Sequence, residues 1–167
     1  RAGPVWPLRA AALRFAVGAG RSAPAAAGGE AGFFAAHGAR LATRAQIDGR
    51  IPALIVLKVA ATRLGAARAD FDPVDMARDI TRATDFCARL APDLVGVLLP
   101  GARVADAERV AGRLEGVARG LVAGDDGDEA VAARAFAVDP HAPFEESLFK
   151  AIAGLPRLRF VAANDAQ

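Results

Sequence analysis

The sequence has few of the residues that build cross-links, metal sites or stacking surfaces. Its 167 residues include one cysteine, one tryptophan, two histidines and no tyrosine. The lone Cys87 excludes an internal disulfide, and His37 and His141 are too far apart in sequence for zinc-ligand spacing. We therefore expect a protein of a reducing compartment, the cytoplasm, that carries no metal and no cofactor.

An excess of charge of either sign is also missing. The 21 basic and 19 acidic residues leave a formal net charge of +2, and Lys58 and Lys150 are the only lysines. This excess is too small to attract nucleic acid, and the scarcity of aromatic residues leaves few surfaces on which bases could stack. We expect no nucleic-acid partner.

The N-terminal region lacks a long apolar run. The stretch from Val5 to Val17 is interrupted by Arg9 and Arg14 and is too short to cross a bilayer, so we expect no membrane insertion of this fragment. Because the first residue is not methionine, we interpret the chain as a piece of a longer protein. Residues 1–22 are expected to be an N-terminal helix and linker from an upstream region, and residues 23–167 one folded domain.

Apolar residues with helical or strand periodicity are abundant: 53% of the chain is hydrophobic and 24% is charged, which is typical of a globular domain. The patterns predict helices over 33–47, 72–84, 104–121 and 144–155, and strands over 51–61, 86–90, 95–99, 130–138 and 158–161. Asp72 and Pro73 are a typical N-cap and first helical residue. This order predicts an α/β sandwich with flanking helices and a mixed sheet, because the hairpin over 86–99 requires at least one antiparallel pair.

The most informative stretch runs from Thr81 to Gly101, TRATDFCARLAPDLVGVLLPG. Its frame resembles that of the GGDEF domain, the diguanylate cyclase fold that condenses two GTP molecules into cyclic di-GMP and carries the pattern R-x-x-D-x-x-x-R-x-G-G-D-E-F-x-x-x-L-P. The matching positions here are Arg82, Asp85, Arg89, the five residues Ala91, Pro92, Asp93, Leu94 and Val95, and then Leu99 and Pro100. The resemblance covers roughly residues 23–161 and implies a GGDEF or nucleotide cyclase-like fold.

The residues that the resemblance assigns to catalysis are absent. The family takes one metal ligand from an aspartate at the end of the first strand and another from the glutamate of the named motif, and those positions hold Lys58 and Leu94, which cannot bind magnesium. Ala91 and Pro92 replace the two glycines, and the guanine-reading amide and carboxylate are missing from TRLGAA at 62–67. We therefore expect a degenerate domain that is not an enzyme.

Arg82 and Asp85 match the family's inhibitory site, R-x-x-D, where cyclic di-GMP binds. A guanidinium can bond phosphate or the O6/N7 edge of guanine, and a carboxylate can accept hydrogen bonds from guanine N1–H and N2–H. Arg113 or Arg109, on the next predicted helix, is a candidate for the second arginine of such a site. The resemblance thus favours a cyclic di-GMP receptor or regulatory module.

Two other interpretations stay open. A second R-x-x-D occurs at Arg103 and Asp106, so Arg82 and Asp85 could simply form a helix-end ion pair. The domain would then be a ligand-free pseudoenzyme used for dimerisation or for docking a protein partner. A GTP-binding regulatory domain is disfavoured, because the positions that would contact the nucleotide have changed.

The remaining candidates have ordinary structural explanations. The acidic residues Asp125, Asp126 and Asp128 lack the rest of a calcium-binding loop and are interpreted as a solvated turn. The phenylalanines are expected in the core, among them Phe33, Phe34, Phe86, Phe136 and Phe149.

Overall fold

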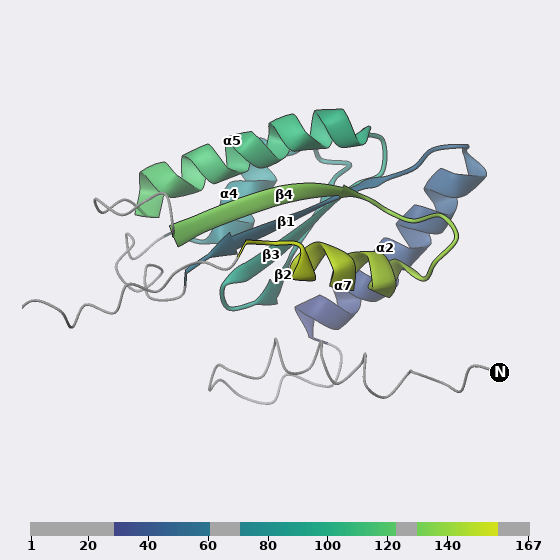
Figure 1. The fold of residues 1–167 in the computed structure, drawn as a ribbon, viewed down its shortest axis with the longest axis horizontal. Coiled ribbons are helices and arrows are strands. Elements are labelled where there is room, and N and C mark those ends of the chain that lie inside the picture. The colour runs from purple at the N-terminus through teal and green to yellow at the C-terminus, as the bar shows by residue number, and fades with distance from the viewer. Residues whose placement is uncertain (1–28, 61–70, 123–129, 157–167) are drawn as a thin grey trace, which may run out of the picture.

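The computed structural model describes residues 29–60, 71–122 and 130–156 (Figure 1). In chain order the elements are α2 (Glu30–Ile47), β1 (Ala53–Val59), α4 (Pro73–Ile80), β2 (Phe86–Ala91), β3 (Leu94–Leu99), α5 (Val104–Val122), β4 (Val131–Ala137) and α7 (Phe144–Ala153). Several sequence predictions lie outside the described residues: the helix over 5–17, the domain boundary near 22, the segment 62–67, the acidic residues 125, 126 and 128, and the strand over 158–161.

The strands form one sheet in the order β2-β3-β1-β4, and every neighbouring pair among these described strands is antiparallel. The α/β class is confirmed, whereas the expectation of a mixed sheet is not met by these pairs. The reason is the placement of the crossovers. Helix α4 joins β1 to β2, which run in the same direction but are separated by β3, and α5 joins β3 to β4 across β1. This is the split β-α-β arrangement of ferredoxin-like folds.

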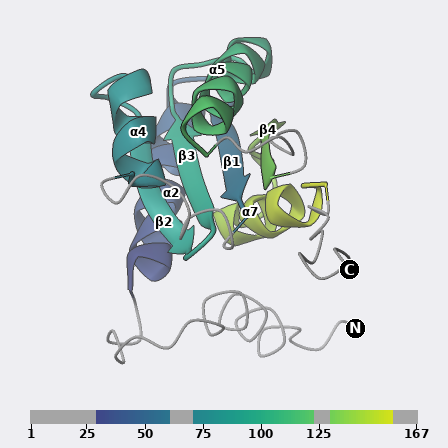
Figure 2. The ribbon, with the colours of Figure 1, turned by 90° about the vertical axis from the view of Figure 1, so that its left-hand side faces the viewer.

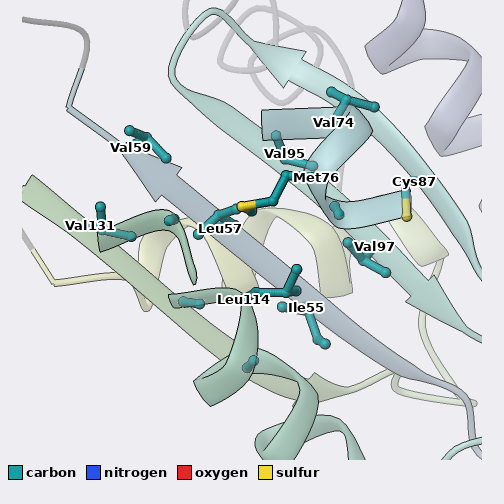
Figure 3. Close-up of a cluster of buried hydrophobic side chains, with 14 of the residues drawn as sticks. Ile55, Leu57, Val59, Val74, Met76, Cys87, Val95, Val97, Leu114 and Val131 are labelled. Atoms are coloured by element: carbon teal, nitrogen blue, oxygen red, sulfur yellow. The ribbon is translucent and has the colours of Figure 1, made fainter. Parts of the chain in front are cut away.

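Helices cover both faces of the sheet (Figures 1 and 2). Helices α4 and α5 pack on one face, where Ile55, Leu57 and Leu114 lie in a buried cluster (Figure 3). Helices α2 and α7 pack on the other, with Phe34 and Leu148 fully buried. Because successive residues of a strand point to opposite faces, a strand covered on both sides must be apolar at nearly every position. This explains the apolar run of β1.

Helix α4 begins as predicted and ends earlier. The Asp72 carboxylate (Oδ1) accepts a hydrogen bond from the Val74 N–H at 2.7 Å, and Pro73 is the first helical residue. The helix was expected to reach about residue 84, but it ends at Ile80 because Thr81 turns to an extended conformation. The Thr81 hydroxyl donates to the Ala77 carbonyl at 2.8 Å, a side-chain contact that competes with continued helix. Residues 82–85 therefore form a loop.

A glutamate from a helix caps each edge strand. Glu30 of α2 accepts the Arg89 N–H of β2 at 3.3 Å, and Glu115 of α5 accepts the Ala133 N–H of β4 at 2.9 Å. Unpaired N–H groups on a sheet edge can pair with another chain, and such contacts reduce that risk. The sequence pattern did not predict them.

Phe34 is fully buried, but Phe33 and Phe149 are 56% and 46% exposed, so the core prediction is wrong for these two. Phe33 and Phe34 are adjacent on α2, where successive side chains point about 100° apart, and only one of them can face the sheet. Phe86 and Phe136 are half-buried and pack against the core.

Candidate functional site

The hairpin that matches the named motif has a turn of only two residues, Pro92 and Asp93. Ala91 is paired with Leu94 in the strand register, and Leu94 and Val95 are 5% and 2% exposed. The connection expected over 91–94 is therefore shorter, because Ala91 and Leu94 are apolar and buried and extend the two strands. A two-residue connection is sufficient to join antiparallel strands.

Lys58 and Asp93 form an ion pair beside this turn. The Lys58 ammonium lies 3.8 Å from the Asp93 carboxylate, and both side chains are about one-third exposed. The backbone supports the pair, since Lys58 is in register with Leu94 and the Val59 N–H donates to the Asp93 carbonyl at 2.9 Å. At such exposure an ion pair contributes only about 0–1 kcal/mol. Its effect on the site is to place a fixed positive charge next to the turn.

A second ion pair ties the hairpin to helix α4. Arg89 Nη2 donates a hydrogen bond to Asp72 Oδ2 at 2.7 Å. Arg89 Nη1 donates a longer one, 3.5 Å, to the Pro92 carbonyl oxygen. Because Asp72 Oδ1 caps α4, this one carboxylate joins the helix start to the hairpin. Asp72 was predicted to cap a helix and Arg89 to belong to the motif, but their contact was not predicted, because they are distant in sequence.

Arg82 and Asp85 are brought together through backbone atoms. The Arg82 N–H donates to Asp85 Oδ2 at 2.9 Å, and the Asp85 N–H donates to the Arg82 carbonyl at 2.9 Å. These reciprocal bonds close the loop after α4. The Arg82 side chain is exposed, and no described residue forms an ion pair with its guanidinium. The loop is therefore not held by an ion pair between the Arg82 and Asp85 side chains, because the Asp85 carboxylate accepts its bond from the Arg82 backbone N–H.

The second R-x-x-D has a different geometry. The Arg103 carbonyl accepts the Asp106 N–H at 3.0 Å in the first turn of α5, and the Asp106 carboxylate forms an ion pair with Arg109. Arg103 and Asp106 are thus ordinary helix-start residues, whereas Arg82 and Asp85 form a closed loop. Arg113 is exposed on α5, and within the described part of the chain no hydrogen bond or ion pair links it to Arg82 or Asp85.

Cys87 follows this loop and is buried. Burial raises the pKa of its thiol; the nearby Asp85 charge also raises this pKa, while the hydrogen bond with Thr81 and the Arg78 charge lower it. The Thr81 oxygen and the Cys87 sulfur are 3.4 Å apart. A buried thiol of raised pKa is a poor nucleophile, so Cys87 has a packing role.

The described residues contain no group of three or more His, Cys, Asp or Glu side chains placed to hold a metal ion. None of their helices has the length and apolar character that a bilayer crossing requires.

No family model matches the chain, and no curated protein matches its sequence. Among solved structures, the chain is similar to the isolated GGDEF domain of PA1120 (TpbB or YfiN) from Pseudomonas aeruginosa. The TM-score is 0.53 and the identity 24%, over 71% of this chain and 76% of that one. At this identity the likeness shows the fold alone: the chain has a GGDEF-like fold.

Proposed function

We propose that this GGDEF-like domain has no cyclase activity and acts as a receptor for cyclic di-GMP through Arg82 and Asp85. Loss of catalysis is supported by the hairpin. Lys58 places an ammonium beside Asp93, where cyclase chemistry needs a divalent cation, and a second positive charge there repels the metal. Leu94, at the position of the motif glutamate, is buried and offers no ligand atom.

The receptor role is supported by the state of the Arg82 side chain. Its guanidinium is exposed, it forms no ion pair with any described residue, and its backbone is fixed by Asp85. A planar donor carried on a fixed loop can bond phosphate oxygens or the guanine O6/N7 edge, and the backbone loses little further conformational entropy on binding. This exposed arginine on a closed loop is the observation that carries the proposal.

Asp85 supplies a reason to select guanine. Its Oδ2 accepts the Arg82 N–H, while Oδ1 accepts no hydrogen bond from the described residues. A guanine base offers N1–H and N2–H donors on its Watson–Crick edge, whereas adenine offers only its amino group there. The site should therefore discriminate between the two bases.

Calorimetric titration of the purified chain tests this function. We expect saturable binding of cyclic di-GMP at micromolar concentrations and about fivefold or more weaker binding of cyclic di-AMP, because one unsatisfied hydrogen bond costs about 1–3 kcal/mol. Equal affinity for both dinucleotides would refute the Asp85 role. The absence of any heat with cyclic di-GMP would reject the receptor function and favour the ligand-free docking domain, for which the exposed Phe33 and Ile47 on α2 are the supporting observation.

A further inference from the structure

Helix α2 carries a second stripe of side chains, and only its N-terminal end packs on the sheet: the rings of Phe33 and His37 lie with their centroids 5.8 and 4.6 Å from that of Phe86 in β2. Phe33, His37, Arg40, Arg44 and Ile47 follow one another at separations of four, three, four and three residues, the spacing of a heptad seam. The two apolar ends are strongly exposed, Phe33 at 56% and Ile47 at 75%. The opposite side of the same helix carries Phe34 and Ala42 into the core. Helix α2 therefore has one seam that packs in the core and a second that is exposed at Arg40, Arg44 and Ile47.

The surface of this stripe is hollowed. Ala39, Arg40, Thr43, Arg44 and Ile47 line a shallow depression of about 390 Å³. Four of these residues lie at positions i, i+3, i+4 and i+7, which are the four that form a hole for one side chain of a facing helix. Spacing and shape thus point to the same kind of occupant, another α-helix.

The positive charges of the stripe limit which helix can bind to it. Arg44 makes only a loose ion pair with Asp48 at 3.9 Å, and Arg40 approaches His37 Nδ1 at 3.3 Å, so two exposed arginines occupy the middle of the stripe. In a second copy of this chain, a parallel arrangement in register would set each arginine against itself. An antiparallel arrangement centred on the middle of the stripe would set Arg40 against Arg40 and Phe33 against Ile47. Like charges facing each other across a helix seam are destabilising.

We propose that the α2 stripe docks an acidic amphipathic helix of a partner protein. Carboxylates of that helix face Arg40 and Arg44, and its apolar residues pack on Phe33 and Ile47. The inference does not rest on cyclic di-GMP binding, because the stripe lies on α2 and the Arg82 loop lies between α4 and β2. Phe86, which follows that loop, contacts only the Phe33 and His37 end of the stripe and not the two arginines.

Two synthetic helices of about three heptads serve as probes. Both carry leucine at the positions that face Phe33 and Ile47, and they differ only in having glutamate or lysine at the central seam positions. By fluorescence anisotropy with the full chain, we expect the glutamate peptide to bind at least about tenfold more tightly than the lysine peptide. The double variant Arg40→Glu, Arg44→Glu should reverse this preference, and Arg109→Glu, Arg113→Glu on α5 should leave it unchanged.

Other occupants give different results. Equal binding of both peptides, or of neither, would overturn the proposal. So would preferential binding to phosphatidylglycerol vesicles that is lost in the Arg40→Glu, Arg44→Glu variant, which would assign the stripe to an anionic membrane surface. A concentration-dependent dimer that Ile47→Asp abolishes would assign it to a second copy. Circular dichroism establishes that each variant is folded, and unchanged cyclic di-GMP titration of the α2 variants separates this test from that of the receptor function.

Discussion

Lys58 on β1 and Asp93 in the hairpin turn form an ion pair 3.8 Å long at the end of the strand register. The pair brings a positive charge of the chain itself to the place where a cyclase of this fold needs a divalent cation. Two ion pairs hold the turn, Lys58–Asp93 on one side and Arg89–Asp72 on the other. This arrangement explains why a hairpin can keep its shape without the residues of the named motif.

We expect no conversion of GTP to cyclic di-GMP by the purified chain with either magnesium or manganese. The variant Leu94→Glu alone should stay inactive, because the new carboxylate would face the Lys58 ammonium across the register and form a second ion pair instead of binding metal. Chromatographic product analysis against a no-protein control measures this. Product above that control, from the wild type or from Leu94→Glu, would show that the inactivity proposal is wrong.

Converting both register partners should create a metal site. In the double variant Lys58→Asp, Leu94→Glu, two carboxylates face each other beside Asp93, and hard divalent cations prefer such oxygen ligands. Leu94 is buried, so its glutamate should destabilise the fold until a cation binds. We expect manganese to raise the melting temperature of this variant and not that of Lys58→Ala, Leu94→Ala. Identical melting temperatures with and without manganese would contradict the register-based geometry.

The strands of the hairpin should contribute more to stability than its turn. Leu99 of β3 is 3% exposed and lies in the buried cluster under α4 and α5, so Leu99→Ala should lower the free energy of unfolding by about 2–5 kcal/mol. Pro92 is exposed in the turn, and Pro92→Ala should lower it by about 1 kcal/mol or less. Urea unfolding measures both values. A larger loss for Pro92→Ala than for Leu99→Ala would mean that the turn organises the hairpin.

The sequence predicted features that depend on local periodicity and missed those that depend on which side chains meet. The Asp72 cap and the apolar face of α5 at Leu114 depend only on residues close in sequence, so the sequence pattern predicts them. The Lys58–Asp93 pair joins strand β1 to the hairpin turn, and its partners are distant in sequence. A lysine in an otherwise apolar strand was the available signal, because a buried strand tolerates such a residue only where its charge is paired or reaches solvent.

Cys87 should make stability depend on alkaline pH. The pKa of its buried thiol is raised above the ordinary value, so the folded state favours the neutral form. The stability that the neutral thiol gives the folded state is fully present below the pKa of the unfolded thiol. It is lost as the pH rises through the pKa of the folded thiol. We expect the urea midpoint to fall more steeply with alkaline pH in the wild type than in Cys87→Ala. Parallel pH profiles for the two proteins would exclude a role of the thiol.

The Arg82 side chain can be removed without disturbing the loop that carries it. Its bonds to Asp85 are made by the backbone N–H and carbonyl, which alanine also has, so Arg82→Ala should unfold at the same urea concentration as the wild type. Affinity for cyclic di-GMP should nevertheless fall by about 2–4 kcal/mol, more than tenfold, because a charged bidentate donor is lost.

Two further variants identify the chemistry of that loss. Arg82→Lys should be nearly as weak as Arg82→Ala, since an ammonium cannot reproduce the planar fork of a guanidinium. Arg103→Ala removes the arginine of the helical R-x-x-D at the start of α5 and should leave the affinity unchanged. If Arg82→Lys bound cyclic di-GMP with full affinity, the contact would depend on the positive charge alone and not on the planar guanidinium. An equal loss in Arg103→Ala would mean that cyclic di-GMP responds to the basic surface of the domain as a whole and not to the closed loop at Arg82.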